Sequence, residues 1–295
     1  MTCFRSILLA VVCGLAPLTV SAQNPPAETP PPAQTPPPAQ TPPADQPDQS
    51  DPDARVDALQ PDFNLAALPT TLRMPLHKLA FRVTHRFTRS YGQGDFGDLV
   101  SDFFGFDSGA QIGLELRYGL MRGTQIGVHR TSDRTIQIFG QHSFWNEGDG
   151  KAIGLDGIAT LEGGNNLQEH FQSTLGTMVS RKLGGFAAVY AEPMFVINAS
   201  PFANQGADNH TLMVGLGGRV RLRPSLYFVG EVTPRLAWFT PGANQVSLGV
   251  EGRAGGHLFQ LNFSNGFGTT LGQLANGTIN YDSWYIGFNI SRKFF

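Results

Sequence analysis

The chain has 295 residues, including 35 glycines and 21 prolines, and only 15% of its residues are charged. This composition is unusual for a soluble helical protein and favours turns and strands. The formal net charge is −2 at pH 7, with Lys and Arg spread along the chain. There is no basic cluster of the kind that binds nucleic acid, so we expect no nucleic-acid partner.

The N-terminus has the pattern of an export signal. Arg5 supplies the positive charge, residues 7–20 supply an apolar stretch, and small residues end at Ala22, as signal peptidase requires. We therefore predict a signal peptide over residues 1–22, cut between Ala22 and Gln23. The alternatives are an uncleaved membrane anchor, for which the apolar stretch is short, and a lipoprotein attached through Cys13. Both cysteines of the chain lie here, so cleavage would leave no thiol.

From residue 23 to about residue 52 the chain is of low complexity. The hexad Thr-Pro-Pro-Pro-Ala-Gln occurs at residues 29–34 and again at 35–40. Proline at this density favours an extended, solvated polyproline II chain that cannot form a core. We predict a disordered, Pro-rich periplasmic spacer over residues 23–69, ahead of a barrel over residues 70–295. A docking site for a periplasmic partner on the proline motifs is the alternative role.

From about His77 to the C-terminus, apolar and polar residues alternate in short segments. In residues 210–222, for example, Leu212, Val214 and Leu216 share one face, and the other face is polar or glycine. This period of two is typical of β-strands that have one apolar face. The pattern predicts about twelve strands, near residues 78–88, 110–118, 123–131, 134–144, 152–161, 170–181, 186–197, 210–222, 225–238, 244–254, 257–265 and 281–294.

The connections between these segments favour a barrel. Short turns recur on most alternate joints and longer connections fall on most of the others, as in bacterial barrels with short periplasmic turns. The polar face is rich in Gly, Ser, Thr, Gln and charged residues of both signs, which is typical of a lumen rather than of a soluble sandwich. The predicted fold is therefore all-β, an antiparallel transmembrane β-barrel of about 12 strands (10 to 14). We expect it to span the bacterial outer membrane and to contact outer-membrane lipid.

The last segment has the features of an outer-membrane assembly signal. Ile286, Phe288, Ile290 and Phe294 lie on one face and end in an aromatic residue. We expect this face to meet lipid and to be recognised by the barrel assembly machinery. Phe295 is out of phase with that face.

Several motifs resemble a known family. The sequence LRMPLHK at residues 72–78 leads into FRVTHRF at 81–87, and FGFD at 104–107 and ELRYGL at 115–120 follow. Together they are similar to the bacterial β-barrel family catalogued as domain of unknown function 5777, over about residues 70–295. The resemblance implies a barrel fold and an outer-membrane location, but no activity, ligand or catalytic residue.

No catalytic or metal-binding pattern stands out. An outer-membrane lipase needs a Ser–His pair on one face, whereas the neighbours His142 and Ser143 point to opposite faces. The seven histidines form no metal-binding motif, and there is no calcium loop. We therefore expect no enzyme activity, metal or cofactor, although an enzyme remains the third alternative for function.

The predicted lumen carries charges of both signs. On the assigned phases they are Arg82, Arg86, Glu115, Arg117, Asp156, Glu192, Arg219, Arg221, Glu231, Arg235, Glu251 and Arg253. Charges in a low-dielectric interior must be paired or hydrated, so this near balance predicts salt bridges across the lumen. The preferred interpretation is a structural or loop-displaying barrel, and the alternative is a passive channel with a slight anion preference.

Overall fold

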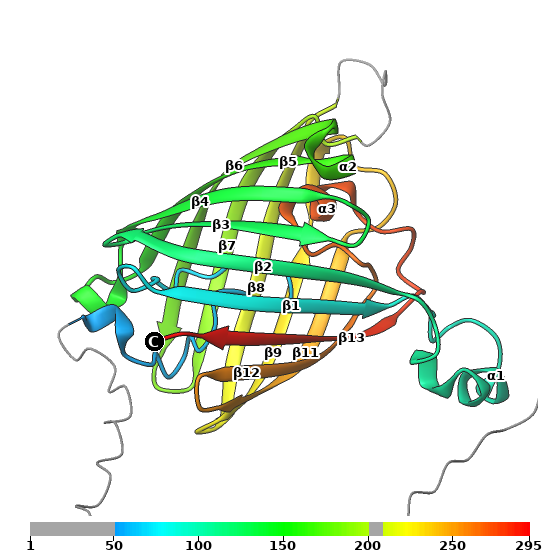
Figure 1. Ribbon diagram of the computed structural model, residues 1–295, viewed down its shortest axis with the longest axis horizontal. Helices are drawn as coiled ribbons and strands as arrows, with labels where there is room; N and C mark the ends of the chain where they lie inside the picture. Colours follow the sequence, from blue (N-terminus) through cyan, green and yellow to red (C-terminus); the bar gives the residue numbers. More distant parts are fainter. Residues whose placement is uncertain (1–50, 201–208) are drawn as a thin grey trace, which may run out of the picture. The chain divides into compact units, whose positions relative to one another are not determined.

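The computed structural model describes residues 51–200 and 209–295 of the chain (Figure 1), all within one compact unit, residues 45–295. The predicted signal peptide, its cleavage site at Ala22 and Gln23, and the hexad repeats lie outside the described residues.

The described residues form a closed antiparallel barrel of 12 strands, as predicted. Pairing between β1 and β13 joins the first strand to the last. Pro234 divides one strand into β9 and β10, which both pair with β8, so thirteen labelled strands make twelve positions. The strands are β1 (Leu79–Phe87), β2 (Ala110–Met121), β3 (Thr124–Thr131), β4 (Ile136–Trp145), β5 (Gly154–Gly163), β6 (Glu169–Leu183), β7 (Ala187–Ile197), β8 (Thr211–Arg223), β9 (Leu226–Thr233), β10 (Arg235–Trp238), β11 (Gln245–Ala254), β12 (His257–Ser264) and β13 (Tyr285–Lys293).

The short helices α1 (Phe96–Ser101), α2 (Gly164–Leu167) and α3 (Leu271–Asn276) lie in the longer connections at one end of the barrel (Figure 1). The short turns, the C-terminus and the first described residues lie at the other end, called the turn end below, which also holds the 3₁₀ turns Pro52–Ala54 and Glu147–Asp149. A third 3₁₀ turn, Phe103–Gly105, follows α1. Within residues 51–200 and 209–295, no helix is long and apolar enough to cross a membrane.

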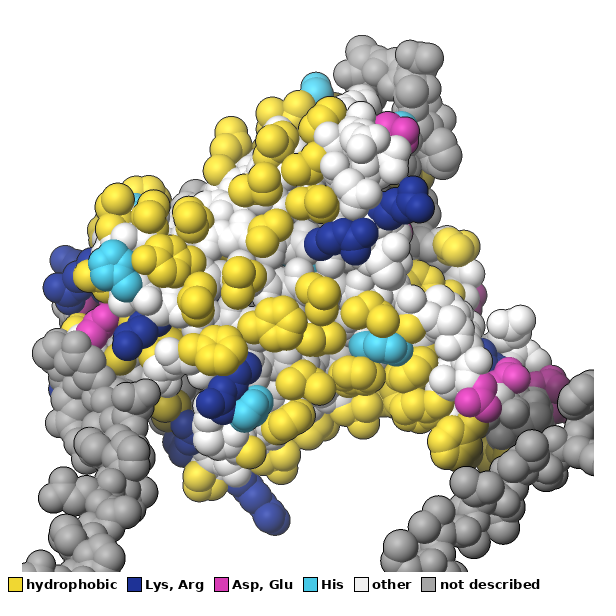
Figure 2. Space-filling view, viewed as in Figure 1, with side chains coloured by type: hydrophobic (Ala, Val, Ile, Leu, Met, Phe, Trp, Pro, Cys, Tyr) yellow, Lys and Arg dark blue, Asp and Glu magenta, His cyan; other side chains and the backbone are white. Residues whose placement is uncertain are grey.

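The alternation seen in the sequence places apolar side chains on the outside of the barrel. Along β2, Leu114 and Leu116 are 47% and 45% exposed, whereas Glu115 and Arg117 between and beyond them are buried. Other strands repeat this arrangement, and hydrophobic side chains cover much of the face in Figure 2. Because a closed barrel pairs every backbone group between strands, such a surface is suited to a lipid environment.

The segment before β1 folds into the barrel. Residues 59–75 are buried apart from the half-buried Arg73, and they belong to the same compact unit as the strands. The expectation of a disordered spacer over residues 23–69 is therefore wrong for residues 59–69. The physical reason is twofold. Side chains of the lumen form hydrogen bonds with the backbone of this segment, and its leucines are buried in an apolar cluster instead of being exposed to water.

Candidate functional site: a hairpin inside the lumen

The centre of the lumen holds a tight hairpin, residues 63–70, which we call the lumen hairpin. Its ends are joined by the hydrogen bond from Thr70 N to Phe63 O at 2.7 Å, and its tip by that from Leu65 N to Leu68 O at 2.7 Å. All eight residues are buried. A buried loop must find partners for its remaining backbone groups, and the barrel wall supplies them.

Glu231 on β9 binds the tip of the hairpin from one side. Its carboxylate accepts hydrogen bonds from the backbone N–H groups of Ala66, Ala67 and Leu68 at 2.9–3.0 Å. Hydrogen bonds to an ionised acceptor are stronger than those between neutral groups. One wall residue therefore satisfies three consecutive donors of the hairpin.

Three side chains of β1 and β13 bind the tip from another side. Arg82 and Arg86 each donate to the carbonyl oxygen of Ala66, at 2.5 and 3.2 Å, and Asn289 Nδ2 donates to the same oxygen at 3.0 Å. Arg82 also lies 3.7 Å from the Glu115 carboxylate. The backbone of Ala66 is therefore held at both its nitrogen and its oxygen.

A buried ion pair supports the hairpin next to its tip. Arg219 on β8 and Glu251 on β11 contact each other through two hydrogen bonds, at 2.5 and 3.0 Å, and neither side chain is exposed. Arg219 Nη2 also donates to the carbonyl oxygen of Asn64 at 2.8 Å. This arginine is engaged by both the wall and the hairpin, so it is not a free wall charge.

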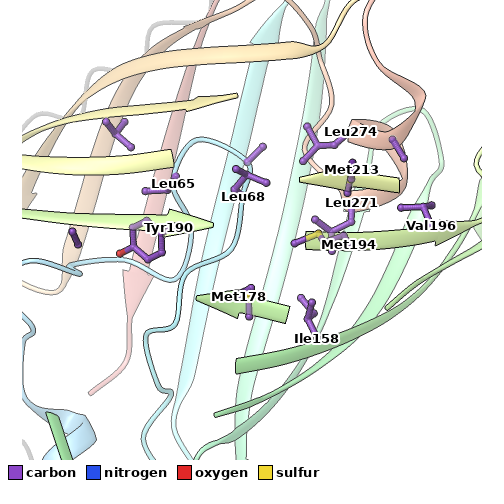
Figure 3. Packing of buried hydrophobic residues seen from close by; sticks show 14 of the residues in the cluster. Leu65, Leu68, Ile158, Met178, Tyr190, Met194, Val196, Met213, Leu271 and Leu274 are labelled. Atoms are coloured by element: carbon purple, nitrogen blue, oxygen red, sulfur yellow. The ribbon is translucent and has the colours of Figure 1, made fainter. Parts of the chain in front are cut away.

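Two glycines of β8 leave room for the leucines of the hairpin. A Cβ atom at Gly215 would lie 2.7 Å from Leu68 Cδ2, and one at Gly217 would lie 2.4 Å from Leu65 Cδ1. Side chains at these positions would therefore collide with the hairpin. The leucines instead join an apolar cluster inside the lumen that includes Met194 (Figure 3).

The connection between β12 and β13 closes the lumen from the loop end. Leu271 and Leu274 of α3 join the same apolar cluster (Figure 3). Glu162 on β5 accepts hydrogen bonds from Thr270 Oγ1 at 2.9 Å and from Gly272 N at 3.1 Å. The lumen hairpin and α3 thus each donate hydrogen bonds to a buried wall carboxylate, the hairpin through three backbone N–H groups and α3 through one N–H group and a hydroxyl.

We predict that Gly272→Ala will weaken the attachment of α3. A Cβ atom at this position would lie 2.1 Å from Gln172 Oε1 and 2.6 Å from Glu162 Oε1, so either the helix or the Glu162 side chain that binds it must move. The expected result is a less stable fold by about 1–3 kcal/mol, as for overpacked cores, measured by urea unfolding in detergent. Gly140→Ala is the matched control, because nothing lies within 4 Å of its Cβ position; equal stability losses in both variants would contradict this packing.

Ion pairs hold the entering segment at the turn end. Lys182 Nζ lies 2.5 Å from Asp57 Oδ2, and Arg73 Nη1 lies 2.6 Å from Asp149 Oδ2. Burial by itself would raise the pKa of Asp57, but the hydrogen bond and charge of Lys182 outweigh burial and hold this pKa below its usual value. The segment is therefore attached at the turn end as well as at its tip.

The structure places ten of the predicted lumen charges in the interior. They are Arg82, Arg86, Glu115, Arg117, Asp156, Glu192, Arg219, Glu231, Arg235 and Glu251, whereas Arg221 and Arg253 are half-exposed. Arg117 contacts Glu115 at 2.8 Å. Arg235 lies toward the loop end, where it donates to the carbonyl oxygens of Ala243 and Asn276 at 2.8 and 3.1 Å.

Sequence reasoning overlooked the neutral and late-strand residues of the site. Glu162 lies on the same inward face as Asp156 but falls one residue beyond the predicted strand. Asn289 is uncharged, and the predicted lumen set contains only charged residues. The buried charges of the described strands are five arginines (82, 86, 117, 219 and 235) and six carboxylates (115, 156, 162, 192, 231 and 251). This balance does not favour anions.

The predicted assembly residues divide by exposure. Phe288 and Ile290 are half-exposed and Phe294 is 53% exposed, whereas Ile286 is buried. Phe295 turns inward and packs beside a second buried cluster, formed by Phe63, Leu72, Met74 and Ala80. The last two residues of the chain therefore point to different sides of the wall.

The residues considered for chemistry are not assembled into a site. Ser143 is buried and accepts from Arg73 Nε at 3.1 Å, while His142 is exposed and contacts Thr124 on the outer face. Among residues 51–200 and 209–295, no group of three or more His, Cys, Asp or Glu side chains could hold a metal ion.

A closed antiparallel barrel with an apolar exterior and a polar, filled lumen defines a membrane-spanning β-barrel. In sequence, residues 62–294 match the family described as a membrane bound beta barrel domain, DUF5777, and the chain belongs to this family. The match begins within the segment that precedes β1, so it includes the lumen hairpin.

Comparisons of structure find barrels at low sequence identity. The NanC porin is 6% identical, with a TM-score of 0.49 over 72% of this chain and 98% of that one. The COG4313 outer membrane channel from Pseudomonas putida F1 is 12% identical, with a TM-score of 0.48 over 81% of this chain and 100% of that one. No curated protein matches the chain in sequence.

Proposed function

We propose that this protein is an outer-membrane barrel that its own lumen hairpin keeps closed, so that it acts as a structural, loop-displaying barrel in this state. The proposal rests on one observation: the Glu231 carboxylate accepts hydrogen bonds from three backbone N–H groups of the hairpin in the middle of the lumen. With α3 closing the loop end, a solute would have to displace chain segments to pass.

The exterior supports the proposed location. The exposed apolar side chains suit contact with outer-membrane lipid, and the exposed Phe294 at the end of the last strand suits recognition by the barrel assembly machinery. The proline-rich residues before the barrel would then lie in the periplasm, where a periplasmic partner could contact them.

Solute passage is the second candidate function. Its support is that the hairpin is held by hydrogen bonds and side-chain packing, and no covalent link fixes residues 63–70 to the wall. Displacement of the hairpin would expose Arg82 and Arg86 on β1 and, a third of the way around the barrel, Glu231 on β9. We therefore replace the slight anion preference expected from the sequence with a preference for solutes that carry both charges.

Planar-bilayer conductance tests both candidates. The wild-type protein should show no conductance steps, and Leu68→Asp should conduct, because Leu68 is fully buried in the apolar cluster and an aspartate there would bury an unpaired charge unless the hairpin leaves. Ile279→Asp places the same charge on an exposed loop residue and should stay closed. Steady conductance by the wild type would contradict the closed barrel, and a folded but silent Leu68→Asp would contradict solute passage.

A further inference from the structure

The two backbone polar atoms of Ala66 bind side chains on different parts of the barrel wall. Its N–H donates to Glu231 on β9, and its carbonyl oxygen accepts from Arg82 and Arg86 on β1. Between β1 and β9 lie β13, β12 and β11, a third of the way around the barrel. One residue therefore spans from an anionic wall to a cationic wall through the sequence of atoms N–Cα–C–O.

Arg82 pairs with Glu115, but two other buried ionisable side chains, Arg86 and Glu192, form no ion pair among the described residues. The buried Arg86 guanidinium contacts only uncharged oxygens, those of Ala66, His85 and Asn289, and its Nε has no hydrogen-bond partner among the described residues. On β7, directly across the barrel from β1, the buried Glu192 has no hydrogen-bond partner for either carboxylate oxygen in the described part of the chain. Buried charges without counter-charges are costly.

We propose that the lumen hairpin occupies a binding site for α-amino acids, with the backbone of Ala66 in the place of the ligand. An α-amino acid has the same N–Cα–C–O atoms, but its ammonium and carboxylate carry full charges. The ammonium would meet Glu231 and the nearby Glu192, and the carboxylate would meet Arg82, Arg86 and Asn289. Charge-assisted hydrogen bonds would then replace those made by a neutral peptide. The proposal rests on the second candidate function, because the hairpin must leave.

The wall beside this site suits a small apolar ligand. When the hairpin leaves, Leu65 and Leu68 vacate the space over Gly217 and Gly215. Met194 and Met213 line the adjoining apolar cluster, and methionine adapts to different shapes. The site would thus take an amino acid with a short apolar side chain, and L-alanine is the natural probe.

Titration calorimetry on the full-length, folded Leu68→Asp variant tests the site directly. L-Alanine should bind at least about tenfold more tightly than L-lactate, which lacks the ammonium, or L-alaninol, which lacks the carboxylate. Leu65→Asp, which buries a charge in the same apolar cluster but leaves the barrel wall unchanged, is a second opened variant and should give the same order. Folding of each variant is checked by heat-modifiable migration on cold gels.

A second substitution in the opened variants assigns the contacts. Glu231→Gln should weaken L-alanine binding about ten- to hundredfold, the loss expected for a charged hydrogen-bond partner, and should leave L-lactate binding unchanged. Arg86→Met should weaken both ligands. Asp133→Asn, at the loop end, is the control and should change neither.

The outcomes separate this inference from the passage on which it rests. Conductance through the opened variants, with L-lactate bound as tightly as L-alanine, would overturn the amino-acid site and leave the passage standing. Folded variants that neither conduct nor bind L-alanine would overturn both. L-Alanine bound tenfold more tightly than both analogues, with the loss caused by Glu231→Gln, would support the site.

Discussion

Arg219→Met should destabilise the barrel by about 3–5 kcal/mol, the usual cost of breaking a buried ion pair from one side. The substitution leaves the Glu251 carboxylate with no cation at 0% exposure, and the carbonyl oxygen of Asn64 loses its donor. Because the same arginine joins the wall to the lumen hairpin, the hairpin should loosen together with the barrel. The measurement is urea unfolding of the detergent-solubilised protein.

A double variant separates the charge effect from a general loss of packing. Arg219→Met combined with Glu251→Leu removes both charges and should recover most of the lost stability, because apolar residues of similar volume often replace a buried pair at little cost. Gln260, which donates to Glu251 at 2.7 Å, would lose one partner in this variant, so recovery should be incomplete. If the double variant is no more stable than the single one, the ion pair is not the cause.

Glu231→Ala should release the lumen hairpin. The substitution leaves three backbone N–H groups without an acceptor in the barrel, and a buried donor without a partner costs about 1–3 kcal/mol. Three such losses sum to about 3–9 kcal/mol, so the three N–H groups should be more stable in water than in the lumen. Residues 57–75 should then become susceptible to limited proteolysis while the strands remain protected.

The graded variant Glu231→Gln provides the comparison. Its amide retains one acceptor oxygen but no charge, so cleavage within residues 57–75 should be slower than in Glu231→Ala and faster than in the wild type. Glu169→Ala, at the exposed start of β6, should match the wild type. Equal protection of the hairpin in Glu231→Ala and the wild type would show that Glu231 does not hold it.

The alternation of apolar and polar residues was sufficient to predict the barrel. In β2, for example, the alternation identifies the outer face by Leu114 and Leu116 and the inner face by Glu115 and Arg117. This works because successive side chains of a strand point to opposite faces whatever surrounds them. The same local rule put ten charges inside the wall and His142 and Ser143 on different sides. Pro234 did not disturb the strand count, since the strand resumes directly at Arg235.

Only the tertiary structure revealed that the lumen is filled. Residues 59–69 have no strand or helix periodicity and follow a proline-rich region, so their sequence resembles a linker. Their partners, such as Glu231 and Asn289, lie more than 150 residues away in the chain, and only barrel closure brings these side chains around Ala66. The local sequence was therefore sufficient to predict the barrel wall, because side-chain alternation is a property of each strand. The filling of the lumen depends on contacts between residues far apart in the chain, and no local sequence pattern predicts such contacts.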